Sequence, residues 1–144
     1  MYRLMVVILG AAIATGFALG CGDGEDEAGA APLTKAEFIE QAEAICAKSL
    51  KEREEDTVSW EKENSGKGNG GTPLTDVVAP SLAQEAEELK TLVPPAEDEA
   101  DVTRMIGRLS EVSEAFEEGD SKKAPRAIEQ FNRESADYGL SGCP

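Results

Sequence analysis

Residues 33–50 read LTKAEFIEQAEAICAKSL, and this stretch decides the fold of the chain. Thr34 can accept a hydrogen bond from the Glu37 amide while the Glu37 carboxylate accepts one from the Thr34 amide, and Leu33 can pack on Phe38. A capping box and a hydrophobic staple together predict a helix start. Apolar residues follow at helical spacing; they are Phe38, Ile39, Ala42, Ile45, Cys46 and Leu50.

Beyond Leu50 the apolar stripe gives way to the charge run KEREED, residues 51–56. We interpret this run as a solvated helical face that continues toward Val58 and Trp60. The segment 64–71, NSGKGNGG, contains four glycines. Each glycine disfavours helix by about 1 kcal/mol relative to alanine, so this segment is predicted to be a loop.

A second helix is predicted from about Leu74 to Leu92, and Pro80 either kinks it or marks its true start. A third helix follows the prolines at 94–95. It opens with the acidic residues of 97–101, which suit the positive end of a helix dipole. Its apolar stripe is the clearest in the chain. The residues of this stripe are Val102, Met105, Ile106, Leu109, Val112 and Phe116.

Gly119 provides a stop for the third helix. The fourth helix is predicted from about Lys122 to Tyr138, with Gly139 after its last turn. Four amphipathic helices with short later connections predict an all-α fold, an antiparallel up-down-up-down four-helix bundle. The predicted domain covers residues 33–144, which is long enough for one lean hydrophobic core.

The N-terminal segment has the parts of an export signal. Arg3 precedes an apolar run from Leu4 to Leu19, and small residues lead into Cys21. The run falls short of the roughly 20 residues that a membrane-spanning helix needs. This segment resembles bacterial lipoprotein precursors, in which the signal is cut before a cysteine that receives lipid. The resemblance implies a signal peptide over 1–20 and a lipid anchor on Cys21 at the extracytoplasmic face of the cell membrane.

Ala18 and Gly20 also suit an ordinary signal peptidase, which would release the protein instead. The segment 21–32 comprises Cys21 and the acidic sequence GDGEDEAGAAP, which predicts a disordered linker. The three cysteines favour lipidation of Cys21, because it leaves Cys46 and Cys143 to form one disulfide in an oxidising compartment. The alternative for these two is a pair of separate buried thiols.

Composition excludes several classes of function. The chain has 14 basic residues against 29 acidic ones, so its surface repels nucleic acid. It has no histidine, which removes the commonest general base and the commonest transition-metal ligand. Glycine-rich nucleotide loops and nucleophile elbows are absent from the sequence as well. We therefore expect no enzymatic activity, no metal site and no cofactor.

A second resemblance rests on three short stretches of the predicted domain. They are FIEQAEAIC at 38–46, LVPP at 92–95 and ADYGLSGC at 136–143. Together they resemble a group of small actinobacterial lipoproteins that has no established activity. The resemblance implies a helical fold, a disulfide and a surface location, and it assigns no catalytic residue.

Trp60, the sole tryptophan of the chain, precedes the glycine-rich loop. The favoured interpretation is that it covers the open end of the helical core, and the alternative is that it is a contact for a partner. Two basic clusters have simpler explanations. Arg104 and Arg108 stand three residues from Asp101 and Glu111, which predicts surface ion pairs.

Lys122, Lys123 and Arg126 are expected to offset neighbouring acids, with an anion site as the alternative.

Two classes of function remain for the whole protein. The first is a membrane-anchored, non-enzymatic module that binds an unknown envelope protein or small molecule. The second is a carrier that holds a small molecule inside the bundle. A cavity between helices favours the carrier, and an exposed apolar or aromatic patch favours the module.

Overall fold

The computed structural model describes residues 31–66, 70–120 and 122–143, and in these ranges it contains helices and no strand. The elements are α1 (Lys35–Asn64), η1 (Leu74–Val78), α2 (Ala79–Lys90), α3 (Glu99–Glu117) and α4 (Lys123–Tyr138). The predictions of an all-helical fold and of four α-helices are therefore confirmed. None of the described helices combines the length and the apolar character needed to cross a membrane. The predicted signal peptide, the lipid site Cys21 and nearly all of the linker lie outside the described residues.

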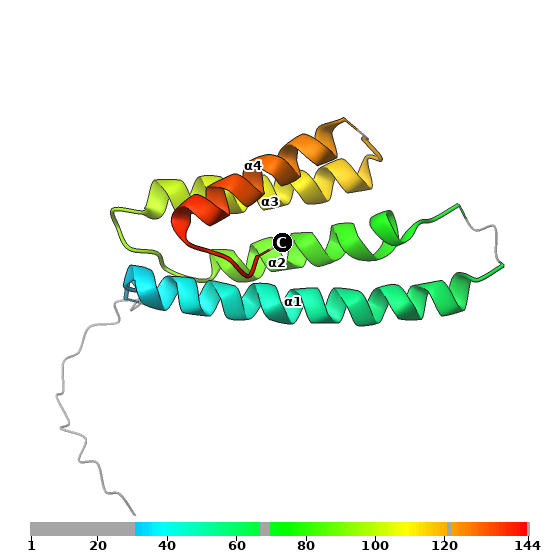
Figure 1. Cartoon of the computed structure of the whole chain (residues 1–144), viewed down its shortest axis with the longest axis horizontal. Helices are drawn as coiled ribbons and strands as arrows, with labels where there is room; N and C mark the ends of the chain where they lie inside the picture. The colour runs from blue at the N-terminus through cyan, green and yellow to red at the C-terminus, as the bar shows by residue number, and fades with distance from the viewer. Residues whose placement is uncertain (1–30, 67–69, 121, 144) are drawn as a thin grey trace, which may run out of the picture.

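The helices pack in chain order, with α2 against α1 and α3, and α3 against α4 (Figure 1). The fourth helix does not pack directly beside the first along its length. The backbones of α1 and α4 do not approach each other closely. The C-terminal tail, residues 139–143, lies between them instead (Figure 1). The rings of Phe38 and Tyr138 also meet edge to face across this space, with centroids 5.8 Å apart.

The start of α1 has the predicted cap. The Thr34 amide donates to Glu37 Oε2 at 2.9 Å, and the Glu37 amide donates to Thr34 Oγ1 at 3.3 Å. The Leu33 amide also donates to the Val93 carbonyl at 2.9 Å, which ties the start of α1 to the segment after α2. From this start α1 continues for 30 residues, through the charge run and Trp60.

Pro80 marks the true start of α2, which confirms one of the two alternatives. It lies in the first turn of α2, where its missing N–H removes no needed hydrogen bond. The turn before it widens into η1, because the Ala79 amide bonds back five residues to the Leu74 carbonyl. At the other ends, Gly119 and Gly139 adopt φ of 65° and 108°, which favours glycine after α3 and α4.

The core is one cluster drawn from all four helices and the tail. The stripe of α3 is buried as predicted, except that Phe116 is only partly buried. Leu50 departs from the prediction, since it is 40% exposed. The α1 helix thus leaves the core one turn earlier than the sequence pattern indicated.

The disulfide between Cys46 and Cys143 is present, with Cα atoms 5.0 Å apart. Two further contacts hold the tail that carries Cys143. Leu140 is buried in the core, and Ser141 donates to Glu43 Oε1 from its amide at 2.9 Å and from its hydroxyl at 2.8 Å.

Candidate functional site

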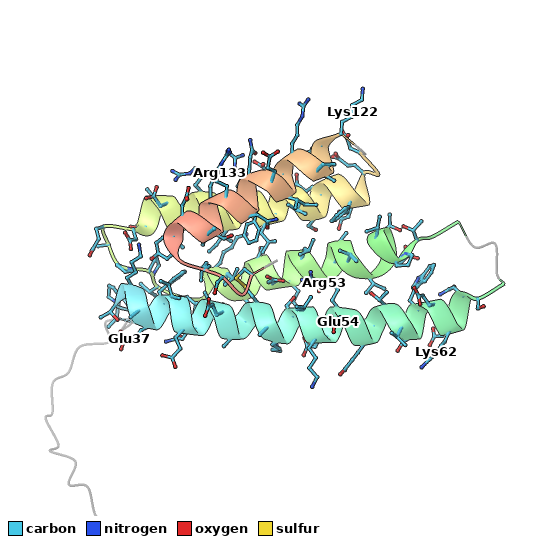
Figure 2. The ribbon with its side chains drawn as sticks, in the orientation of Figure 1. Glu37, Arg53, Glu54, Lys62, Lys122 and Arg133 are labelled. Carbon is cyan, nitrogen blue, oxygen red and sulfur yellow. A yellow bond between two sulfur atoms is a disulfide. The ribbon has the colours of Figure 1, made fainter. Side chains whose placement is uncertain are left out.

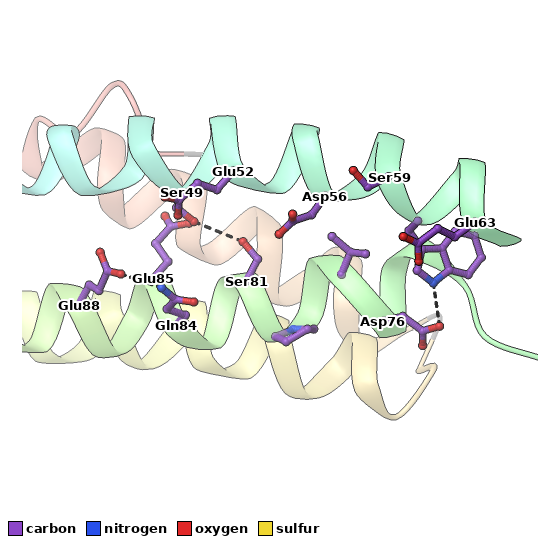
Figure 3. A pocket seen from close by; sticks show the side chains of 13 residues that line it. Ser49, Glu52, Asp56, Ser59, Glu63, Asp76, Ser81, Gln84, Glu85 and Glu88 are labelled. Atoms are coloured by element: carbon purple, nitrogen blue, oxygen red, sulfur yellow. Dashed lines mark hydrogen bonds between the residues drawn. The ribbon is translucent and has the colours of Figure 1, made fainter.

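A groove of about 360 Å³ separates α1 from η1 and α2 (Figure 3). Its lining includes carboxylates from both walls and no basic side chain among the described residues. The acidic residues are Glu52, Asp56 and Glu63 of α1, Asp76 of η1, and Glu85 and Glu88 of α2. Trp60 and several serines complete the lining. The groove is therefore strongly negative, with one aromatic ring.

The α1 wall carries its groups on one helical face. Glu52, Asp56 and Trp60 follow one another at four-residue intervals, and Glu63 comes three residues later. Residues at these intervals stack along the same side of a helix. The three carboxylates are exposed and form no ion pair within the described part of the chain. They line the groove as a row of negative charges, of which Glu52 is near enough to Lys48 to raise the pKa of that amine (Figure 3).

The opposite wall is joined to α1 near both ends of the groove. At one end the Trp60 indole N–H donates to Asp76 Oδ2 at 3.0 Å. At the other end Lys48 binds Glu88 at 3.1 Å, and Gln84 donates to the same carboxylate at 2.9 Å. The hydrogen bonds from Gln84 and Lys48 lower the pKa of Glu88. These contacts hold the two walls at a fixed separation.

Glu85 forms a buried part of the groove. Its side chain is fully buried, and its Oε2 accepts from Arg53 at 2.6 Å. The second oxygen, Oε1, has no hydrogen-bond partner among the described residues. Burial raises the pKa of Glu85, and neighbouring Ser49 and Arg53 offset this only in part. A carboxylate with one unsatisfied buried oxygen is energetically unfavourable unless it takes up a proton or a ligand or ion completes its contacts.

Arg53 corrects the interpretation of the charge run as a solvated face. Its side chain is only 11% exposed and lies between α1 and α2 (Figure 2). The guanidinium also donates to Ser81 at 3.1 Å and to Ser49 at 3.2 Å. The burial of Glu85 was not predicted from the sequence, although a signal exists: Glu85 falls in helical phase with the buried residues Leu82, Ala86 and Leu89.

Trp60 lies in the groove. It is partly buried, and it is not among the side chains packed on the core cluster. The suggestion that it covers the open end of the core is therefore not supported. Trp60 lines the groove, where its indole N–H donates to Asp76.

The two basic clusters form ion pairs. Arg104 meets Asp101 at 2.7 Å and Arg108 meets Glu111 at 2.9 Å, as the spacing predicted. Both arginines also approach Glu134 of α4, at 3.4 and 3.5 Å. These contacts join α3 to α4 on the surface.

At the start of α4, Lys123 pairs with Glu118 at 3.2 Å. The Asp120 carboxylate accepts the amides of Lys122 and Lys123, each at 2.9 Å. These hydrogen bonds lower the pKa of Asp120. Asp120 thus occupies these two backbone donors, whereas the side chains of Lys122 and Arg126 form no ion pair among the described residues and leave the alternative of an anion site open.

Two other hollows bear on the choice between carrier and module. A space of about 130 Å³ lies among core side chains including Leu82, Leu109 and Phe131. It is smaller than the roughly 300–1,000 Å³ of typical small-molecule sites. A hollow of about 350 Å³ beside Leu74, Phe116 and Pro125 is mostly apolar. The acidic groove differs from both, since it combines comparable size with convergent polar groups.

Comparison with known protein families, with curated proteins and with solved structures found no match to this chain.

Proposed function

We propose that the chain is a membrane-anchored, extracytoplasmic binding module without enzymatic activity, and that its acidic groove binds an organic cation with several spaced positive charges. The observation that carries this proposal is the row of unpaired carboxylates on α1 beside Trp60. The proposal includes an antiparallel up-down-up-down arrangement of the four helices. It also includes attachment of the chain to the cell membrane by lipid on Cys21.

The cysteines support the location. The disulfide uses Cys46 and Cys143, so Cys21 is left over for lipid. Disulfides persist chiefly in oxidising compartments outside the cytosol. A Cys21→Ser variant should therefore move from the detergent phase to the aqueous phase on phase partitioning. Wild-type protein already in the aqueous phase would contradict the anchor.

The spacing of the charges indicates the class of ligand. Glu52 and Asp56 are four residues apart, and Asp56 and Glu63 are seven apart. At a rise of about 1.5 Å per residue these pairs are about 6 and 10 Å apart along α1. Single bonds of about 1.5 Å place amines joined by three or four methylenes about 5–6 Å apart. A linear aliphatic polyamine can therefore place two successive ammonium groups opposite Glu52 and Asp56 and a third one step further, near Trp60, whereas Glu63 lies about two such steps beyond Asp56.

Trp60 adds an attraction that does not depend on carboxylates. An ammonium group over an indole ring gains about 0.5–1 kcal/mol at an exposed site. Exposed ion pairs contribute about 0.2–1 kcal/mol each. Several such contacts predict weak binding that salt screens readily.

Isothermal titration with a linear triamine tests the proposal, and fluorescence of the sole tryptophan provides a second signal. The triple variant Glu52→Gln/Asp56→Asn/Glu63→Gln should lower affinity at least tenfold. The matched control, Glu54→Gln/Glu55→Gln/Glu61→Gln, removes the same charge from α1 positions outside the groove and should bind nearly as wild type. Equal losses in the two triple variants would mean that only net charge attracts the amine, and absence of binding to wild type would refute the proposal.

A carrier with its ligand inside the bundle is the alternative. It would have to use the space of about 130 Å³ among the core side chains. No observation favours it over the groove.

A further inference from the structure

The geometry points to a second ligand site, at which reduced Cys46, reduced Cys143 and Glu85 bind Zn²⁺. Within residues 31–66, 70–120 and 122–143, these three form one set of potential metal ligands whose donor atoms all lie within 4.8 Å of one another. Their spacing needs only small adjustments to reach Zn–S and Zn–O distances of about 2.0–2.3 Å around one ion. The inference does not depend on the proposed binding of a cation in the groove.

Glu85 has an oxygen available for the metal. Arg53 occupies Oε2, whereas Oε1 has no hydrogen-bond partner in the described structure and belongs to a fully buried side chain. Buried polar atoms normally have a partner, and an unsatisfied one calls for an explanation such as an ion. A metal at this position would satisfy Oε1 without disturbing the Arg53 contact.

The tail would keep Cys143 near Cys46 after the disulfide is reduced. The Leu140 amide donates to the Ser135 carbonyl at 2.8 Å, and the Leu140 side chain is buried. The two hydrogen bonds from Ser141 to Glu43 hold the next residue. The tail therefore has several non-covalent contacts that do not involve sulfur.

The chemistry balances with a thiol as the reductant. Two thiol molecules reduce the Cys46–Cys143 bond, yielding two cysteine thiols and one external disulfide. Zn²⁺ then displaces both thiol protons. Two thiolates, one carboxylate and Zn²⁺ sum to one negative charge, which the Arg53 guanidinium offsets in the buried site.

The ligand set selects the metal. Thiolates with one carboxylate suit Zn²⁺, which takes four ligands and can hold water in the fourth position. Ca²⁺ and Mg²⁺ require oxygen ligands throughout. In the oxidised protein the sulfurs are bonded to each other and supply no thiolate. Metal affinity therefore depends on the redox state of this pair.

Cobalt titration of the full chain tests the site, since Co²⁺ bound by thiolates absorbs in the near ultraviolet and, when tetrahedral, in the visible. A phosphine reductant avoids competing thiols. We expect both bands in reduced wild type, their loss when Zn²⁺ is added, and no bands in the oxidised protein. Glu85→Gln should bind Co²⁺ at least tenfold more weakly. The matched variant Glu88→Gln, three residues further along the same helix, should bind Co²⁺ as wild type does.

Absence of thiolate–cobalt absorption in the reduced wild type overturns the site, and so does equal affinity in Glu85→Gln. Thermal melting distinguishes metal binding by the folded reduced protein from metal binding by an unfolded chain. Zn²⁺ should raise the melting temperature of the reduced protein and leave that of the oxidised protein unchanged. Cobalt binding without any such increase would indicate cysteines in an unfolded chain, and would overturn the site as well.

Discussion

The helices α1 and α3 differ in how far buried residues extend along them. Buried residues occur along most of α3, from Val102 to Ala115. In α1 they stop at Ser49, and no residue of the following fifteen is buried. That second half of α1 is joined to α2 and η1 through Arg53 and Trp60, which make polar contacts. The part of α1 that continues past its core contacts has one face that is not packed on the core. This face lines the acidic groove.

Reducing the disulfide should give the largest loss of stability, because the crosslink between the tail and α1 restricts the unfolded chain. A crosslink between residues 97 apart stabilises the fold by about 4–5 kcal/mol in the loop-entropy treatment. Urea denaturation of oxidised and reduced protein, both with a chelator present, measures the difference. A loss below about 1 kcal/mol would show that the tail is held mainly by Leu140 and Ser141.

The contrast between the two helices predicts opposite outcomes for truncation of an apolar residue. Leu109→Ala in α3 should lower the free energy of unfolding by about 3 kcal/mol, because the residue is 1% exposed and leaves a cavity. Val58→Ala in the second half of α1 should change it by less than about 0.5 kcal/mol, since Val58 is 49% exposed. Similar losses at both positions would remove the distinction drawn between α1 and α3.

Arg53→Met tests whether one buried polar contact anchors the second half of α1. It should cost about 2 kcal/mol, less than full loss of a buried ion pair, because Glu85 can take up a proton instead. Since burial raises the pKa of Glu85, the variant should lose stability as pH rises from 4.5 toward the raised value. Denaturation curves at several pH values show this trend. Lys51→Met is the control, since Lys51 is exposed and its contact with Glu55 is 3.9 Å long.

The smallest effect concerns the tail contact at Glu43. Hydrogen bonds from the Ser141 amide and hydroxyl lower the pKa of Glu43 below its ordinary 4.5. The contact therefore stabilises the tail above pH 4.5 and is lost as the pH falls through the lowered value. The protection factor of the Ser141 amide against hydrogen exchange should fall over that range in wild type. It should already be low in Glu43→Gln, and Glu40→Gln should behave as wild type.

Local signals in the sequence were sufficient for the helices. The Thr34–Glu37 cap, the prolines and the glycines after α3 and α4 act through nearby backbone, so the boundaries follow from short stretches. The disulfide followed from the count of cysteines and the compartment. The helix boundaries and the disulfide can therefore be predicted without knowing which helices pack together.

The groove could not be predicted in the same way. Glu85 and Arg53 are 32 residues apart, and each alone resembles an ordinary exposed charge. Their burial depends on how α1 and α2 pack, which the apolar stripes specify only in part. The return of the tail toward Cys46 was expected from the pairing of Cys46 with Cys143, but its insertion between α1 and α4 was not, since Leu140 is a single apolar residue outside any periodic segment.

The unbroken length of α1 has a consequence for membrane electrostatics. Trp60 lies 26 residues beyond Thr34, which is about 39 Å at a rise of about 1.5 Å per residue. Screening in physiological salt extends about 8 Å from a charged surface. If lipid on Cys21 anchors the chain and α1 points away from the membrane, the far end of the groove would stand several screening lengths from the lipid headgroups, and cations there would be captured from the bulk medium.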